Sequence, residues 1–404
     1  MSIVNSLPDH ILIDIFSALT YSSDESRLCA PETLSHVSSH WRAVALDASA
    51  LWTFIVVSFP ISDDQIDRAK AGLHRSKDRA IDLHIDVRDP ERNWDLGEDR
   101  HQMRSVFMVE IMRWLGSTHP RWRSLTVLTD TWAPMHTFLA YSATMITSLP
   151  RLEELSLNRC NAFAGLPDAP DPVPSDPVEL FGGNADLPKL RHVTLAGTHI
   201  DYSRTGFKNL LSLDLRHQAY SVSPTIPQLC QLLHACPGLK SLSLIALNPP
   251  SEGDDEGDGP EVSLPHLTDL TLGWWSVEDA VKLLDALKLP IVQNLVLEDI
   301  APTLLQNDHV VHDSTAILGA LVKMGNRQYH PAAPPSFPSY LHRLTINGLL
   351  LDPTAFSQFM PFLVNLEELE LKAVQPDLVR AVGRRAANID VYRGDSESVI
   401  LRVR

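Results

Sequence analysis

The segment LTDLTL at residues 267–272 indicates how most of this chain is expected to fold. Its apolar positions are separated by two residues and then by one, and the final alternation is typical of a β-strand that buries one face. The pattern recurs as LEELSL (152–157), LRHVTL (190–195), LLSLDL (210–215), LKSLSL (239–244), VQNLVL (292–297), LHRLTI (341–346) and LEELEL (366–371). Weaker copies occur at 54–59, 80–85, 123–128 and 388–393. The sequence therefore predicts many similar strands.

The distance between successive copies indicates one type of repeat. Measured at the last apolar residue of each clear copy, the steps are 38, 20, 29, 28, 25, 49 and 25 residues. Most of these steps fall within the length range of leucine-rich repeats. The two long steps contain Pro-rich stretches at 167–177 and 331–338, which a stacked array accommodates as outward loops.

Helical patterns fill the intervals between strands, at 102–115, 226–235, 276–287, 314–324, 354–363 and 376–387. In the third of these, Ser276 and Asp279 form a capping-box-like start. One strand, one turn and one helix per unit predicts an α/β leucine-rich-repeat solenoid, a horseshoe with a concave parallel sheet and convex helices. We assign residues 54–404 to this irregular domain, with insertions near 161–180, 248–262 and 301–339.

The turn after each strand departs from the commonest repeat. The position three residues past each signature ordinarily holds a buried polar residue that bonds the turn. Here only Cys160, Thr198 and Gln218 can hydrogen-bond at that position, because the other copies carry apolar residues there. We therefore expect an irregular array.

Residues 1–53 are organised differently, as a module of three short helices. The segment LPDHILIDIFSAL at 7–19 carries an apolar stripe, Ser6 can cap it, and Pro8 near its first turn loses no helical hydrogen bond. A second helix is expected from Pro31, and a third through Trp41. Three short helices bury too little surface to be stable alone, so the module needs a partner or the downstream domain to pack against.

This module resembles the F-box-like module of large fungal families. The matching residues are Leu7-Pro8, Ile11-Leu12, Ile15-Phe16, Ala30-Pro31, Val37-Ser38, Trp41-Arg42, Ala45 and Leu51-Trp52. The resemblance implies that the module binds a Skp-type adaptor of a cullin–RING ubiquitin ligase. Its implied adaptor-binding residues are Leu7, Pro8, Ile11, Leu12 and Ile15. The sequence departs from the family at Ser38-Ser39-His40, where relatives usually place Cys or basic residues, and in its longer connector at 20–29.

The repeats suggest a surface for a target protein. In each strand the leucines point into the core, so the residues between them point to the concave solvent side. These residues are small and polar in the middle of the array and acidic towards both ends, which suits a basic target. We assign Asp214, Asp269 and Trp274 to target binding, with Trp274 exposed at the rim of the sheet. Packing of Trp274 against Trp275 and the neighbouring turn is the alternative.

These features predict a substrate receptor of an SCF-type ubiquitin ligase. The alternative is a protein-binding scaffold with no ligase partner, in which the helical module caps the solenoid. We expect no enzyme activity, cofactor or metal, since the chain lacks GxSxG, Walker, HExxH and strand-linked GxGxxG motifs. His309 and His312 have an HxxH spacing without a third ligand nearby.

Composition excludes several other classes of partner. The formal net charge is −16, so the chain has no general attraction for nucleic acids or anionic membranes. No apolar run approaches the ~20 residues of a membrane span, and we expect no signal peptide. The four cysteines form no CxxC pair, and the acidic stretch 251–261 is expected to be a solvated loop. A cytoplasmic or nuclear location fits best.

Overall fold

The computed structural model describes residues 7–20, 30–92, 105–160, 177–183, 185–218, 222–247, 261–300, 313–327, 337–385, 389–393 and 398–403. The chain divides into two compact units. The first comprises residues 1–160 and 181–190, and the second comprises residues 161–180 and 191–404.

The first unit begins with the predicted helical module. It contains α1 (Asp9–Thr20), α2 (Ala30–Ser35), α3 (Ser39–Asp47) and the 3-10 helix η3 (Ser49–Trp52). Leu12 and Phe16 of α1 pack into a buried core with Leu34, Val44, Ala45, Ala48, Leu51 and Trp52. Ser38 starts α3, because its hydroxyl accepts a hydrogen bond from the Trp41 amide at 3.1 Å. The residues that depart from the family pattern thus include a helix cap.

Trp52 joins this module to the first strand–helix pair, β1 (Phe54–Ser58) and α4 (Asp63–Arg75). Its indole N–H donates to the Ala45 carbonyl at 2.8 Å, within the module. The guanidinium of Arg75, at the end of α4, lies over the Trp52 ring at 4.4 Å from its centre. Of the two supports expected for the module, the structure therefore shows the downstream domain.

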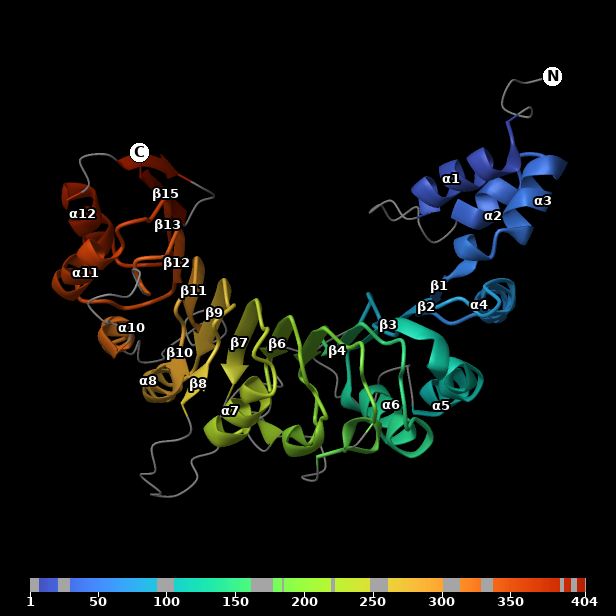
Figure 1. Cartoon of the computed structure of the whole chain (residues 1–404), viewed down its shortest axis with the longest axis horizontal. Helices are drawn as coiled ribbons and strands as arrows, with labels where there is room; N and C mark the ends of the chain where they lie inside the picture. The colour runs from blue at the N-terminus through green and yellow to red at the C-terminus, as the bar shows by residue number, and fades with distance from the viewer. Residues whose placement is uncertain are drawn as a thin grey trace. The chain divides into compact units, whose positions relative to one another are not determined.

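Four parallel strands follow one another in the first unit: β1, β2 (Ile81–Asp86), β3 (Trp122–Thr129) and β4 (Glu154–Arg159). Between them lie α4, α5 (Ser105–Leu115), the 3-10 helix η5 (Gly116–Arg121) and α6 (Trp132–Met145). In Figure 1, α4 can be followed next to β1 and α6 next to β3, and both pairs are in contact. The register places buried apolar residues side by side across the sheet, in the row Ile55, Leu83, Leu125 and Leu155.

The second unit continues this arrangement. Its parallel strands are β5 (His192–Ala196), β6 (Ser212–Arg216), β7 (Ser241–Leu247), β9 (Asp269–Trp274), β11 (Asn294–Asp299), β12 (Arg343–Asn347) and β13 (Glu368–Lys372). The α-helices are α7 (Ile226–His234), α8 (Val277–Ala286), α10 (Thr315–Arg327), α11 (Pro353–Phe359) and α12 (Pro376–Arg385). Figure 1 shows α7, α8 and α10 on the same side of the strands. The buried row here is Val193, Leu213, Leu242, Leu270, Leu295, Leu344 and Leu369.

Short elements complete the chain. The 3-10 helices η7 (Leu180–Gly183), η8 (Tyr202–Arg204) and η10 (Met360–Phe362) occupy connections, and β8 (Val262–Ser263) pairs in parallel with β10 (Leu287–Lys288). The parallel sheet and the six predicted helices are therefore confirmed. Two helices, α4 and α6, were not predicted.

One predicted strand forms but does not join the parallel array. The weak copy at 388–393 forms β14 (Ile389–Arg393), which pairs antiparallel with β15 (Ser398–Val403), and β15 runs antiparallel to β13. Only residues 394–397 separate β14 from β15, and parallel neighbours need a crossover of a dozen or more residues, so these two strands pair as an antiparallel hairpin. β15 occupies the place beside β13 that a further parallel strand would have taken.

The position three residues past each leucine signature is partly as predicted. Gln218 is fully buried and its Nε2 donates to the carbonyls of Leu195 and Arg216, both at 3.0 Å, so it bonds the turn. Cys160 is exposed, but its thiol also donates to a backbone carbonyl, that of Asn158, at 3.9 Å. Most of the expected insertions, and the pair His309 and His312, lie outside the described residues.

Two tryptophans of the module offer a matched test of its packing. Replacing Trp52 by Phe leaves the buried Ala45 carbonyl without its donor, and we expect a loss of ~1–3 kcal/mol in the free energy of unfolding of the first unit. Among the described residues the Trp41 Nε1 has no hydrogen-bond partner, so Trp41→Phe removes no such bond and should cost less. Urea denaturation of both variants measures the difference, and equal losses would contradict this assignment.

Candidate protein-binding site

Helix α1 carries apolar side chains on a face that the module does not bury. Ile11 is 37% exposed and Ile15 is 41% exposed, and Leu19 one turn further on is exposed as well. Pro8, one turn before Ile11, is also exposed. Residues four apart lie on the same side of a helix, so these side chains form one stripe. We call Pro8, Ile11, Ile15 and Leu19 the α1 stripe.

Two of the residues implied as adaptor contacts lie elsewhere. Leu12 is 0% exposed at the centre of the module core, and Leu7 is half-buried and packs against that core. The assignment of Leu12 to an accessible surface is therefore wrong. The reason is helical geometry: adjacent residues point about 100° apart, so each pair Ile11-Leu12 and Ile15-Phe16 places its first member outside and its second inside.

Contacts between α1 and α3 fix the orientation of this stripe. The Trp41 ring lies 4.8 Å from the Phe16 ring, centre to centre, on the inner side of α1. At the start of α1, His40 Nε2 lies 3.4 Å from the exposed Asp9 carboxylate. Trp41 packs against the core, as its predicted role as an anchor requires.

A second candidate surface is the sheet face of the second unit that carries the residues between the leucines. We call it the polar face, and its members Asp214 and Asp269 are partly exposed. Asp214 accepts hydrogen bonds from Arg216 Nε at 2.7 and 2.9 Å. Asp269 accepts from Asn294 Nδ2 at 2.7 Å and from the Thr268 hydroxyl at 2.5 Å. Both carboxylates are thus held in place by neighbours on the same surface.

The polar face extends beyond the residues that the sequence singled out. Glu298 on β11 is half-buried, and burial raises its pKa although the Asn347 amide donates to it at 3.0 Å. Glu370 on β13 is paired with Lys372 at 3.0 Å. Arg216, Glu298 and Lys372 were missed because the strands continue past the end of the leucine signature, where the same two-residue alternation would have indicated them.

Trp274 does not stand exposed at the rim of the sheet. It is 5% exposed, so the expectation of an accessible anchor is wrong. Strand β9 extends as far as Trp274, and the alternation that buries Leu270 and Leu272 therefore buries Trp274 on the same side. The alternative expectation of a packed tryptophan is closer to the structure.

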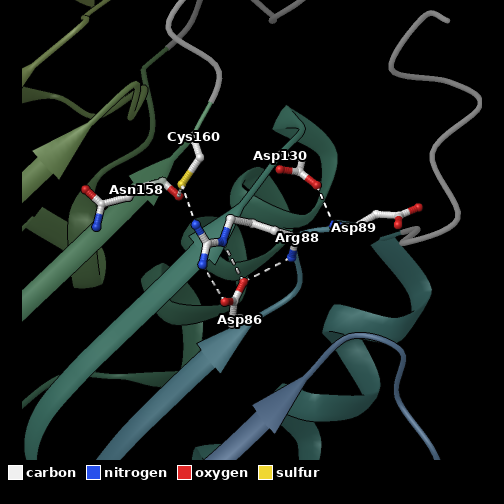
Figure 2. Close-up of polar contacts among 6 residues, drawn as sticks. All are labelled: Asp86, Arg88, Asp89, Asp130, Asn158 and Cys160. Atoms are coloured by element: carbon white, nitrogen blue, oxygen red, sulfur yellow. Dashed lines mark hydrogen bonds and ion pairs between the residues drawn. The ribbon is translucent and has the colours of Figure 1, made fainter. Parts of the chain in front are cut away.

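In the first unit, a polar cluster ties together the ends of β2, β3 and β4 (Figure 2). Arg88 donates to both oxygens of Asp86, at 2.8 and 2.7 Å, and its Nη1 lies 4.0 Å from the Cys160 thiol. The Asp89 amide donates to the buried Asp130 at 2.6 Å. Burial raises the pKa of Cys160 and the nearby Arg88 only partly opposes this, which disfavours the reactive thiolate. The cluster is suited to joining strand ends.

Within the described residues, no three His, Cys, Asp or Glu side chains are placed to hold a metal ion together. In the same part of the chain, no helix has the length and apolar character needed to cross a membrane.

His84 provides a pH test of the first unit. Burial lowers its pKa, which Asp86 raises and Arg88 lowers further. The unfolded chain therefore binds a proton more readily, and the free energy of unfolding should fall as the pH drops below the ordinary histidine pKa of about 6.5. We expect His84→Gln to reduce this loss between pH 7.5 and pH 5.5, as measured by urea denaturation. The same change at the exposed His74 is the control, and an equal effect there would contradict the assignment.

Comparison with known proteins agrees with the geometry of the helical module. Residues 4–58 match the family model described as F-box-like. No curated protein matches the chain. The matched segment includes all three module helices, η3 and β1. The chain therefore carries an F-box-like domain at residues 4–58.

Proposed function

We propose that this protein is a substrate-receptor subunit of an SCF-type cullin–RING ubiquitin ligase. The observation that carries the proposal is the exposure of Ile11 and Ile15 on the outer face of α1, within a domain that matches the F-box-like family. An apolar stripe left in water on a folded domain marks a surface for another protein. The partner proposed for it is a Skp-type adaptor.

In this proposal the protein makes and breaks no covalent bond. It holds a target so that one of the target's lysines is close to a ubiquitin-conjugating enzyme carried by the same assembly. Holding two reactants together in this way raises their effective concentration, which by itself accelerates the transfer. The F-box-like domain and the target-binding surface therefore need only to bind.

For the target we propose a basic surface that docks on the polar face of the second unit, which we take to be formed by leucine-rich repeats. Asp214, Asp269, Glu298 and Glu370 contribute negative charge there, and Arg216 and Lys372 neutralise part of it. A basic target side chain could replace Arg216 on Asp214 because their bond lies on a partly exposed surface. The net charge of −16 supports attraction of such a target over longer distances.

The alternative, a binding scaffold whose helical module only caps the repeats, is favoured by the contact between Arg75 and Trp52. That contact shows the module packing on the first strand–helix pair, as a cap would. It uses the end of the module, however, and leaves Ile11 and Ile15 exposed. The adaptor proposal accounts for both features, whereas the cap accounts for only the first.

A pull-down with a purified Skp-type adaptor tests the proposal. We expect Ile11→Asp combined with Ile15→Asp to weaken adaptor binding at least ~30-fold, because two central apolar contacts become charged. Val364→Asp changes a side chain that is 70% exposed in the second unit and is the matched control. Circular dichroism and the thermal midpoint check that the double variant folds.

Two results would contradict the proposal. One is a wild-type chain that does not bind the adaptor, and this would favour the scaffold. The other is a folded double variant that binds as well as the wild type, which would show that the α1 stripe is not the contact surface.

A further inference from the structure

A small pocket opens in the second unit between helices α7 and α8, at the ends of strands β7 and β9. Leu229 and Leu283 line it from the two helices, and Leu244, Leu247 and Leu272 line it from the strands. Its volume is about 40 Å³. Figure 1 shows α7 and α8 on the same side of these strands. Neither the α1 stripe nor the polar face includes this pocket.

The size of the pocket limits what can fill it. Sites for whole small-molecule ligands usually measure ~300–1,000 Å³, so this pocket is too small for such a molecule. It is large enough for a few non-hydrogen atoms, and its leucine walls offer a water molecule few hydrogen bonds. The pocket therefore suits an aliphatic group of a larger molecule, the rest of which remains outside the pocket.

Polar groups on one side of the pocket set a second requirement for the bound molecule, after its aliphatic group. Asp279 in the first turn of α8 lines the pocket, and its amide donates to the Ser276 hydroxyl at 3.3 Å. The Asp279 carboxylate is half-buried, and burial raises its pKa although Ser276 and Lys282 act in the opposite direction. A carboxylate in this state gains from a further donor or cation. The neighbouring Glu278 is already paired with Lys282 at 2.9 Å.

Trp274 contributes a third feature. It lines the pocket, and its Nε1–H is buried without a hydrogen-bond partner among the described residues. A buried donor without an acceptor is energetically unfavourable. A backbone carbonyl bound at this atom would supply that acceptor. The occupant thus needs an aliphatic group, a nearby carbonyl oxygen and a nearby cation. A polypeptide has all three, in its side chains and its backbone.

We infer that this pocket anchors a leucine, isoleucine or valine side chain of a bound polypeptide, with a lysine or arginine next in sequence facing Asp279. The inference deepens the proposed recognition of a target and rests on that function for its biological role. It names a short feature of the target, an aliphatic residue followed by a basic one. It also places an anchor on the helix side of the strands, apart from the polar face.

The probe is the capped dipeptide acetyl-Leu-Lys-amide, compared with acetyl-Ala-Lys-amide and acetyl-Leu-Glu-amide. The full-length chain is labelled with 5-fluorotryptophan, and its ¹⁹F spectrum is followed during titration. Trp274→Phe identifies the Trp274 resonance. We expect a saturable shift of that resonance by acetyl-Leu-Lys-amide, with affinity at least tenfold higher than for either comparison dipeptide.

Variants check the location. Ala280 lines the pocket, so Ala280→Leu should fill it and abolish the shift, whereas Ala286→Leu, in the same helix but not lining the pocket, should preserve it. Asp279→Asn should remove the preference for lysine over glutamate. If Ala280→Leu does not fold, the comparison of the three dipeptides on the wild-type chain decides.

The inference is overturned if Trp274 does not respond to acetyl-Leu-Lys-amide, or if the alanine dipeptide acts equally well. A response that persists in a folded Ala280→Leu variant would also overturn it. None of these measurements involves the adaptor. A chain that fails the adaptor pull-down can therefore still pass this test, and the reverse is also true.

Discussion

The structure depends on the register that aligns buried aliphatic residues on neighbouring parallel strands. Leu213, Leu242, Leu270 and Leu295 lie side by side, and no one of these strands could bury its own leucines alone. A slip by one residue would turn the leucines to solvent and bring Asp214 or Asp269 into the core. The same constraint therefore fixes both the core and the order of charges on the polar face.

The sequence predicted the recurring strands. It missed features that depend on the surroundings of a single element, such as helix α6 and the burial of Trp274. The signature and its weaker copies located each described parallel strand of the large sheet, because burial of one face leaves a two-residue alternation, but they missed the short parallel pair of β8 and β10. Helix α6 escaped prediction because its segment, WAPMHTFLAYSATM, is apolar on most sides and has little helical period. Trp274 was misplaced because the end of β9 was not visible, although one more step of the alternation would have buried it. The sequence located the apolar helix at 7–19, but which member of each apolar pair faces outwards depends on the positions of α2 and α3.

The two sides of α1 have different roles in the F-box-like domain. Its inner side, with Leu12 and Phe16, completes the core of the module, and its outer side keeps Ile11 and Ile15 in water. Trp52 then connects the module to the sheet through two different kinds of contact, a hydrogen bond to Ala45 and a ring that faces the Arg75 cation. The contacts that attach the module and the surface proposed to bind the adaptor are thus separate, so a change in one need not disturb the other.

The hairpin of β14 and β15 also bears on how such a protein can grow during evolution. The outer edge of β13 is hydrogen-bonded to β15, which runs in the opposite direction. A duplicated strand–helix unit added after β13 would have to displace this hairpin before it could pair. A unit duplicated between two existing parallel strands would find a matching edge on both sides. Gene duplication is therefore expected to lengthen this sheet from within.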